Sequence, residues 1–243
     1  MEQVKLKFKY ECCENVTAFP VIVVAAGSST RMKGVNKQLL SIGGIPVIVR
    51  TLQCFEKSPY ASKIILVVRE EDILSMQHLV SEYEINKVTD IVAGGKDRHA
   101  SVLNGISRLA KDEDKVMIHD GARPLVTDFI IGNVASELET NDAVICGIKI
   151  VDTVKRTDEN GVVTETVDRN GLYAVQTPQG ICVSRYFEAC EKLDDASLFT
   201  DDAGIFEAAS IPVKMVMGSP RNIKITTPED VPLAEIYLKG ELL

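Results

Sequence analysis

The chain contains no tryptophan, only 5% aromatic residues, three histidines and six cysteines. The cysteines form no Cys-x-x-Cys pair and share no zinc spacing with the histidines, so the sequence indicates neither a disulfide framework nor a metal centre built from them. It also lacks an apolar run near the roughly 18 residues of a membrane span and an apolar signal core at its start. We therefore expect a cytoplasmic protein without membrane contact. The scarcity of aromatic residues predicts an aliphatic core, as parallel sheets usually have.

Positive charge is also in deficit. The net charge of −8 over 243 residues argues against a general nucleic-acid surface. An anionic small molecule can still bind where cations converge locally. The chain has 45% hydrophobic and 26% charged residues, an ordinary globular balance that supplies a sizeable core. Its length suits one large α/β domain with at most a small appendage.

Buried strands and amphipathic helices alternate from Phe19 onward. Apolar runs predict strands at 20–25, 63–68, 87–92, 115–119 and 143–149. Apolar stripes predict helices at 70–83, 98–110 and 127–139. Repeated β-α-β units with short connections predict an α/β fold with a mostly parallel, Rossmann-like sheet and helices on both faces. We assign residues 1–18 to an N-terminal extension and residues 19–243 to a single domain.

Residues 152–170 interrupt this alternation. Their polar pattern around Asn160-Gly161 predicts a tight β-hairpin in which both turn residues take positive φ. Such a hairpin projects as an arm and needs a partner surface, and a second copy of the chain is the simplest partner. The sequence therefore predicts a homodimer.

Shorter elements are expected after the arm. Thr177-Pro-Gln179 marks a restart of the chain, and helices follow near 184–193 and 201–209. Strands are predicted at 213–217 and 222–226. A final helix over 228–238 is predicted to start with Thr227 as its N-cap and Pro228 at its first position.

The most informative segment is Val21-Ile-Val-Val-Ala-Ala-Gly-Ser-Ser-Thr-Arg-Met32, followed by Lys37-Gln38. A buried strand runs into a loop of small residues, through which backbone N–H groups can approach a polyphosphate while Arg31 and Lys37 neutralise its charge. The pattern is neither a Walker A loop nor a dinucleotide fingerprint. A tight strand-to-helix turn is the alternative interpretation.

Two further loops follow predicted strands, at the carboxyl ends where such sheets bind ligands. Gly94-Gly95 precedes a helix with Ser101 in its first turn, an arrangement that can hold a phosphate or a base edge. Asp120 leaves a strand end and can sit beside a phosphate-bound Mg²⁺. A salt bridge between Asp120 and Arg123 is the simpler interpretation of that pair.

Two cations and one polar pair complete the candidate residues. Arg169 can hold a substrate phosphate with two hydrogen bonds, or it is a solvated hairpin residue. Lys224 lies in a short apolar segment and either faces a ligand or points to water from a strand edge. Thr200-Asp201 is either a helix cap or a contact for a polar substrate.

Together these segments match one family in order and spacing. From Phe19 to Leu238 the chain resembles the 2-C-methyl-D-erythritol 4-phosphate cytidylyltransferases of the non-mevalonate isoprenoid pathway. The segments that carry the resemblance are Ala25-Ala-Gly-Ser-Ser-Thr-Arg-Met32, Lys37-Gln38, Gly94-Gly95, Arg98-His-Ala-Ser-Val102, His119-Asp-Gly-Ala-Arg-Pro124, Asp152-Thr153, Thr166-Val-Asp-Arg-Asn-Gly-Leu172, Thr177-Pro-Gln179, Thr200-Asp201 and Asn222-Ile-Lys-Ile-Thr226.

The resemblance implies that a phosphate oxygen of methylerythritol phosphate attacks the α-phosphorus of CTP and that pyrophosphate leaves. It implies catalytic roles for Arg31, Lys37, Arg169 and Lys224. It implies CTP contacts from Ala25, Ala26, Gly27, Gly94, Gly95, Asp97 and Ser101. It implies contacts to the polyol phosphate from Asp120, Arg123, Thr153, Thr177 and Thr200, with Mg²⁺ as the cofactor beside Asp120. Thr153 and Arg169 lie on the arm, so the family pattern places them in the partner's site of a homodimer.

Departures from the family pattern are small. Asn36, Gly121 and Asp202 stand where Pro, Ala and Glu are common. The nearest alternative is a ribitol 5-phosphate cytidylyltransferase, which has the same loop and chemistry, although Ala122-Arg123 favours the methylerythritol family. A sugar-1-phosphate nucleotidyltransferase that uses UTP or dTTP is a more distant alternative. A regulatory module that binds a nucleotide on the same fold is the non-enzymatic one.

Overall fold

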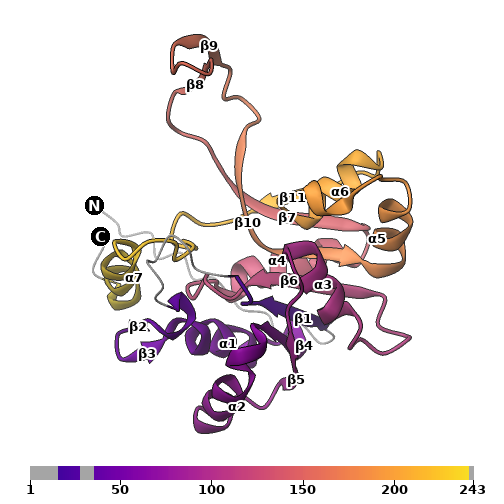
Figure 1. Cartoon of the computed structure of the whole chain (residues 1–243), viewed down its shortest axis with the longest axis vertical. Helices are drawn as coiled ribbons and strands as arrows, with labels where there is room; N and C mark the ends of the chain where they lie inside the picture. Colours follow the sequence, from indigo (N-terminus) through magenta and orange to yellow (C-terminus); the bar gives the residue numbers. More distant parts are fainter. Residues whose placement is uncertain (1–15, 28–35, 241–243) are drawn as a thin grey trace, which may run out of the picture.

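The computed structural model describes residues 16–27 and 36–240. Its centre is a seven-stranded sheet with the order β11-β7-β10-β6-β1-β4-β5 (Figure 1). The strands are β1 (Phe19–Val24), β4 (Ala61–Val68), β5 (Val88–Ala93), β6 (Lys115–Asp120), β7 (Ala143–Lys149), β10 (Tyr173–Cys182) and β11 (Lys214–Met217). Only β10 runs antiparallel to its neighbours in this sheet; the other pairs are parallel. The predicted α/β class with a mostly parallel sheet is confirmed.

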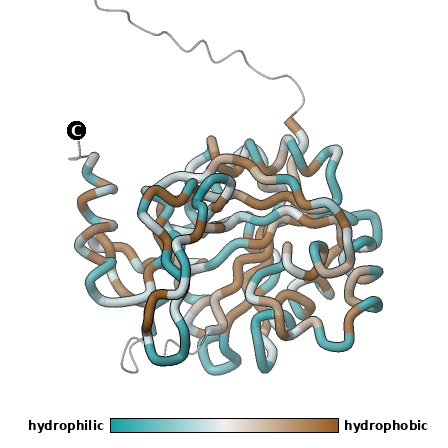
Figure 2. Tube along the Cα trace, turned by 90° about the horizontal axis from the view of Figure 1, so that it is seen from above, coloured by the Kyte–Doolittle hydropathy of each residue, from teal (hydrophilic) through white to brown (hydrophobic). Residues whose placement is uncertain are grey.

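Helices cover both faces of this sheet. Side chains of β1 alternate between two cores, because Val21 and Val23 face one side and Ile22 faces the other. The first core packs against α1 (Val47–Lys57), α2 (Ile73–Glu82) and α4 (Asp128–Leu138), and the second against α3 (Arg98–Ile106), α5 (Val183–Cys190) and α6 (Asp202–Ala208). Figure 2 shows hydrophobic segments gathered inside the body and hydrophilic ones around it. Burial on both faces explains why the strands read as continuous apolar runs.

Short elements connect these layers. They are the 3₁₀ turns η2 (Lys37–Leu39), η3 (Glu70–Asp72) and η4 (Ala196–Leu198), and the small hairpin of β2 (Ser41–Ile42) and β3 (Ile45–Pro46). The last helix, α7 (Asp230–Lys239), packs on a third apolar cluster that includes Ile42, Ala122 and Ile225. None of the helices within the described ranges is long and apolar enough to cross a bilayer.

The predicted arm is present as β8 (Val154–Thr157) and β9 (Val163–Val167), which pair with each other and stand away from the body (Figure 1). Its turn is longer than predicted. Asp158 N donates to Val162 O at 3.0 Å, and the Asp158 carboxylate accepts from the backbone N–H groups of Asn160 and Val162. Gly161 has φ of +80°, but Asn160 has no positive φ, so the expectation of two such residues was wrong. The Asp158 side chain supports the chain reversal that Asn160 was expected to make.

Strand β10 was not predicted. Its inner half contains Gln176, Thr177, Pro178 and Gln179 in place of an apolar run, yet it is buried between β6 and β7 with an irregular register from Gln176 to Gln179. The side chains of Gln176 and Gln179 form hydrogen bonds with partners outside the strand. Gln176 exchanges two hydrogen bonds with the backbone of Ser219, of 2.9 and 3.2 Å. Tertiary partners therefore outweigh the local polarity.

The strand predicted at 222–226 does not form. Ile225 N donates to Ala122 O at 2.8 Å, but the segment crosses the ends of the sheet without a ladder of bonds. The final helix begins at Asp230, not Pro228, and Thr227 is not its N-cap. Asp230 Oδ2 instead accepts from the backbone N–H groups of Thr226 and Thr227, so an acid inside the helix takes over the predicted capping. This crossing places Lys224 over the strand ends.

Candidate active site

Three loops meet at the carboxyl ends of β1, β5 and β6. Gly121 N donates to Val24 O at 2.8 Å, which ties the loop after β6 to the end of β1. Gly94 lies so close to the loop after β1 that a Cβ atom built on it would be 2.3 Å from Cβ of Ala26. Glycine is required at this position because any side chain would push the two loops apart. The predicted meeting of strand-end loops is therefore present.

These loops enclose a cavity of about 370 Å³, called cavity A here. Its lining combines backbone from small residues with charged side chains, namely Val24, Ala26, Gly27, Lys37, Gln38, Gly95, Lys96, Asp97, Arg98, Ser101, Asp120, Ala122 and Lys224. Main-chain groups near glycine and alanine can approach a flat base or a phosphate closely. The charged side chains bring positive and negative charge together in one cavity.

One wall of cavity A is the start of α3. Asp97 is the N-cap, and its Oδ1 accepts from Ala100 N at 2.7 Å. Ser101 Oγ donates to Asp97 O at 2.8 Å and accepts from Gly95 N at 3.1 Å. Ser101 thus fixes the glycine loop on the first turn of the helix, and the positive end of α3 faces the cavity.

Another part of the lining comes from η2. Asn36 caps it by accepting from Gln38 N at 3.1 Å, and Lys37 lines the cavity. Gln38 is only 3% exposed, and its Oε1 has no hydrogen-bond partner within the described part of the chain. A buried amide oxygen without a hydrogen-bond partner carries an energetic cost, so Gln38 is held in the wall of cavity A at some expense of stability.

A second hollow of about 420 Å³, cavity B, adjoins cavity A. It is lined by Arg98, Asp120, Arg123, Val175, Gln176, Thr177, Gln179, Thr200, Asp201, Glu207 and Lys224. Arg98, Asp120 and Lys224 line both cavities. Two ligands bound side by side would therefore meet at two cations and one carboxylate.

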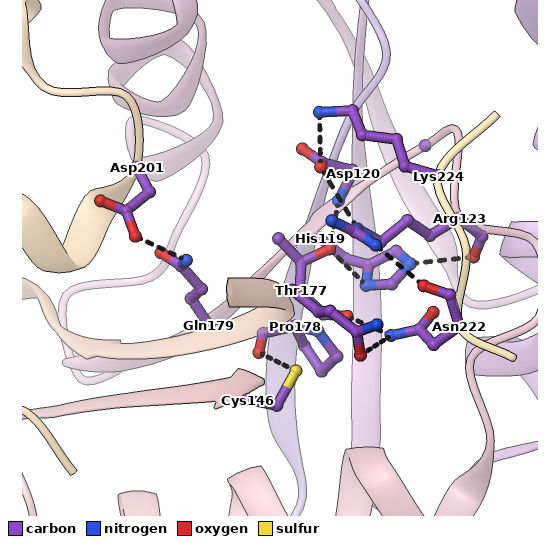
Figure 3. A network of polar contacts seen from close by, with 12 residues as sticks. His119, Asp120, Arg123, Cys146, Thr177, Pro178, Gln179, Asp201, Asn222 and Lys224 are labelled. Atoms are coloured by element: carbon purple, nitrogen blue, oxygen red, sulfur yellow. Dashed lines mark hydrogen bonds and ion pairs between the residues drawn. The ribbon is translucent and has the colours of Figure 1, made fainter. Parts of the chain in front are cut away.

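Asp120 is the electrostatic centre of this junction (Figure 3). Lys224 Nζ lies 2.8 Å from Asp120 Oδ2, and Arg123 Nε lies 3.5 Å from the same oxygen. Burial alone would raise the pKa of Asp120, but the charges of Lys224 and Arg98 and the hydrogen bond from Lys224 lower it far below its ordinary value. The carboxylate is ionised throughout the physiological range, so it can face a cation or a metal-bound water. The salt bridge between Asp120 and Arg123, favoured from sequence, is present.

His119 lies behind Asp120 and contacts several site residues (Figure 3). Its Nδ1 is 3.1 Å from Thr177 Oγ1, and its Nε2 is 3.2 Å from Arg123 O. Thr177 Oγ1 also accepts from Asp120 N at 3.0 Å. The ring is fully buried, and this desolvation lowers the pKa of His119 to about 4, so the ring is neutral at pH 7.

Arg98 and Asp202 are site residues that received no role from the sequence. Arg98 Nη2 lies 2.6 Å from Asp202 Oδ2, and Asp202 is 1% exposed. Burial disfavours the charge on Arg98, but Asp202 outweighs it through Coulomb attraction and a hydrogen bond and raises the pKa of Arg98. The position of Arg98 directly after the glycine loop was the available signal. Its distant partner Asp202 could not be paired with it by spacing.

The structure brings most of the predicted residues together, without testing their roles. Ala26, Gly27, Lys37, Gly95, Asp97, Ser101, Asp120 and Lys224 line cavity A, and Asp120, Arg123, Thr177, Thr200 and Lys224 line cavity B. Ala25 and Gly94 lie in the loops behind cavity A and are not in its lining. Thr153 and Arg169 are exposed on the arm and line neither cavity, and Arg169 Nη1 donates to Val151 O. Arg31 lies outside the described residues.

The site fits a divalent cation that is shared with a ligand. Among residues 16–27 and 36–240 there is no group of three or more metal-binding side chains. Asp120 offers one carboxylate to both cavities, and Gln38 lines cavity A. Mg²⁺ commonly takes one or two carboxylates and completes its shell with water and substrate phosphates. The donor set therefore suits a metal that arrives with a polyphosphate.

Comparison with known proteins gives one consistent result. Residues 19–240 match the family model described as 2-C-methyl-D-erythritol 4-phosphate cytidylyltransferase. The chain is 42% identical over 222 residues to the protein of that name from Bacillus cereus (strain ATCC 10987 / NRS 248), covering 90% of this chain and 97% of the relative. It is 41% identical over 227 residues to the one from Geobacillus kaustophilus, with 92% and 98% coverage.

A solved structure agrees with these sequence relatives. The crystal structure of 4-diphosphocytidyl-2C-methyl-D-erythritol synthase from Anaerococcus prevotii superimposes with a TM-score of 0.80 at 32% sequence identity. The match covers 92% of this chain and 96% of that chain. The structural similarity therefore extends over most of the chain.

Proposed function

The chain belongs to the 2-C-methyl-D-erythritol 4-phosphate cytidylyltransferase family, and from that premise we propose how its residues divide the work of the reaction. The enzyme transfers the cytidylyl group of CTP to 2-C-methyl-D-erythritol 4-phosphate and releases pyrophosphate. The observation that carries our assignment is the junction of two cavities at Arg98, Asp120 and Lys224. Two anionic reactants need such a place to meet.

Cavity A is the CTP site in this proposal. The small residues after β1 and the glycine loop before α3 present main-chain groups to the base and ribose, and the start of α3 favours negative charge. Lys37 lines the same cavity and neutralises the triphosphate. Arg31 is assigned the same task from the family pattern.

Cavity B is the site of the polyol phosphate. Arg123 and Lys224 attract its phosphate, and Thr177 and Thr200 add polar contacts. Lys224 now lies 2.8 Å from Asp120 and is also within reach of cavity A, so it can stabilise charge on both reactants. Because Lys224 lines both cavities, we give it a catalytic role.

The chemistry follows from this arrangement. An oxygen of the polyol phosphate attacks the α-phosphorus of CTP, the bond from that phosphorus to the bridging oxygen of the β-phosphate breaks, and pyrophosphate leaves with the electron pair. The attacking phosphate is already ionised, so no general base is required. Catalysis consists of positioning two anions and stabilising the charge that develops between them. Lys37 contributes from cavity A, and Lys224 contributes from the junction of the two cavities.

We propose that Asp120 holds Mg²⁺ together with the triphosphate. When bound, the metal neutralises charge on the phosphates and assists departure of pyrophosphate. The chain's own part is to keep the Asp120 carboxylate ionised, which Lys224 and Arg98 ensure by lowering its pKa.

We propose further that the arm completes the site of a second subunit. Thr153 and Arg169 line neither cavity of their own chain, and the arm stands away from the body (Figure 1). Val151, Val162 and Val163 are 76%, 61% and 55% exposed, which is apolar surface that a partner would cover. A homodimer with exchanged arms satisfies both observations.

The cation assignment is tested by Lys37→Ala. Losing a charged contact to the transition state should cost about 3–4 kcal/mol, or roughly 10²–10³ in kcat/KM. The fold should persist, because Lys37 lies on a short surface turn. Lys214→Ala, at a half-exposed lysine on β11 outside both cavities, is the matched control and should keep full activity. Equal losses in both variants would refute the assignment.

The arm assignment is tested by mixing two inactive variants, Arg169→Ala and Lys224→Ala. If Arg169 acts in the partner's site, each mixed dimer has one competent site, and a random equimolar mixture should regain about a quarter of the wild-type rate. If Arg169 acts within its own subunit, both sites of the mixed dimer stay defective and no activity returns. Sedimentation of the wild-type chain as a monomer would also overturn the proposal.

A further inference from the structure

A third hollow, of about 530 Å³, lies among α3, α5 and the loop of residues 107–114, and we call it groove C. It shares no lining residue with cavities A and B. Its apolar lining consists of Leu103, Ile106, Leu109, Ala110, Val183 and Phe187. The side chain of Phe187 is 45% exposed, so an aromatic wall of this groove is open to water. A hollow lined by apolar side chains in this way is typical of a binding surface.

The loop that borders groove C is acidic. Residues 111–114 contain three acids and one lysine, and two of the acids, Glu113 and Asp114, line the groove. The structure holds both carboxylates in place: Glu113 Oε2 lies 2.6 Å from Lys63 Nζ, and Asp114 Oδ1 accepts from Ser184 N at 2.8 Å. An occupant that fits groove C is therefore apolar where it contacts the groove and positively charged elsewhere.

The described chain enters the sheet beside this groove. Strands β1 and β6 are parallel neighbours, with Val21 opposite Met117, and each begins two residues before that pair. Asp114 directly precedes β6, so it lies beside the start of β1. The ion pair of Lys63 and Glu113 joins β4 to the same loop, and β4 and β6 are the two neighbours of β1. The residues that precede Val16 are therefore attached close to groove C.

The sequence of residues 4–10 matches the groove in pattern and charge. It reads Val-Lys-Leu-Lys-Phe-Lys-Tyr, an uninterrupted alternation of apolar residues and lysines. In an extended segment this alternation places the apolar side chains on one face and the three lysines on the other. Residues 11–17, which separate this segment from β1, can span up to about 23–25 Å. That length is sufficient to bring residues 4–10 onto a groove whose wall adjoins the start of β1.

We propose that residues 4–10 bind in groove C of their own chain, with the side chains of Leu6 and Phe8 packed against Phe187. Burial of these apolar side chains drives the association. The lysines face water and the acidic loop, which adds a weaker attraction that salt screens. The segment then ties α3 to α5, and the start of α3 is a wall of cavity A. The extension assigned from sequence becomes a strap on the domain.

The full chain offers a direct test because it contains no tryptophan. A single tryptophan is introduced by Phe8→Trp on the apolar face of the segment, or by Lys7→Trp on the opposite face as the matched control. We expect the emission of Phe8→Trp to be shifted to shorter wavelength and its quenching by acrylamide to be several-fold weaker than in Lys7→Trp. Equal emission and equal quenching in the two variants would overturn the proposal.

A second substitution identifies the surface that shields the tryptophan. Adding Phe187→Asp to Phe8→Trp should abolish the shift and restore quenching to the level of Lys7→Trp, and Phe187→Ala should act in the same direction. Phe129→Asp, at a 67% exposed phenylalanine of α4 on the other face of the sheet, is the control and should leave the shift unchanged. Circular dichroism checks that each variant stays folded. A shift that survives both Phe187 substitutions would place the segment elsewhere, such as the free edge of β5, and would overturn the proposal.

A mixing experiment distinguishes binding within the chain from binding to a second copy. The double variant Phe8→Trp with Phe187→Asp has the reporter but a defective groove, and it is incubated with an excess of the wild-type chain, whose groove is intact. We expect its emission to stay that of an exposed tryptophan. A shift to shorter wavelength on mixing would show that the segment binds the groove of another chain and would overturn the proposal. None of these results depends on the reaction assigned to cavities A and B.

Discussion

The buried histidine behind the site makes a specific prediction about acid stability. His119 is fully buried, and its pKa is lowered from 6.5 to about 4. In the unfolded chain the same histidine binds a proton near pH 6.5. Acidification from pH 7 to pH 4 should therefore destabilise the folded protein through this one residue.

The sign and the size follow from linkage. Above pH 6.5 both states have a neutral ring, so the full stability is present. As the pH falls, the unfolded state binds a proton first, and stability is lost until the folded-state pKa near 4 is reached. A lowering of about 2.5 units, at about 1.36 kcal/mol per unit, corresponds to a loss of about 3 kcal/mol.

The assay is urea unfolding at a series of pH values for wild type and His119→Gln, which cannot titrate. The variant is expected to be less stable at pH 7, but the stability difference should shrink by about 3 kcal/mol toward pH 4. Asp120 does not account for a change in stability between pH 7 and pH 4. Its pKa is lowered in the folded state, so the stability that it provides is lost only as the pH falls below the ordinary aspartate range. His78→Gln, at an 81% exposed side chain, is the control. A stability difference between wild type and His119→Gln that stays constant from pH 7 to pH 4 would refute the reasoning.

Two further predictions concern packing and buried charge. Gly94→Ala places a methyl group 2.3 Å from the side chain of Ala26 and should destabilise the fold by about 1–3 kcal/mol, whereas Gly27→Ala meets no atom within 4 Å and should be near neutral in the same urea melts. Arg98→Ala leaves Asp202 buried without its cation and should cost about 3–5 kcal/mol. Adding Asp202→Asn should restore much of that loss, and a double variant no more stable than Arg98→Ala would contradict a charge-based penalty.

Much of the fold could be predicted because its signals are local. Continuous apolar runs predicted the parallel strands, and the rule that ligands bind at their carboxyl ends predicted where Ala26, Gly95 and Asp120 would meet. The rest depended on tertiary partners. Strand β10 is polar where Gln176 and Gln179 are satisfied by distant groups, so its local pattern does not predict a buried strand.

The same distinction applies to the site. Residues in glycine-rich loops and at strand ends could be found by type and spacing. The pair of Arg98 and Asp202 could not, because 104 positions separate the partners and only the packed fold brings them within 2.6 Å. The bonds of His119 depend on the exact placement of Thr177 in a strand that was not predicted. Cytoplasmic location and the lack of nucleic-acid binding stay predictions from composition.

The most direct test of the central claim is ³¹P NMR of the products formed from CTP and Mg²⁺ with either methylerythritol 4-phosphate or ribitol 5-phosphate. We predict that the first polyol alone gives pyrophosphate and a cytidine diphosphate ester, in equal amounts. Product from ribitol phosphate alone would contradict the assigned substrate while keeping the chemistry. CTP binding without product from either polyol would contradict the assignment of cavities A and B as one reaction site.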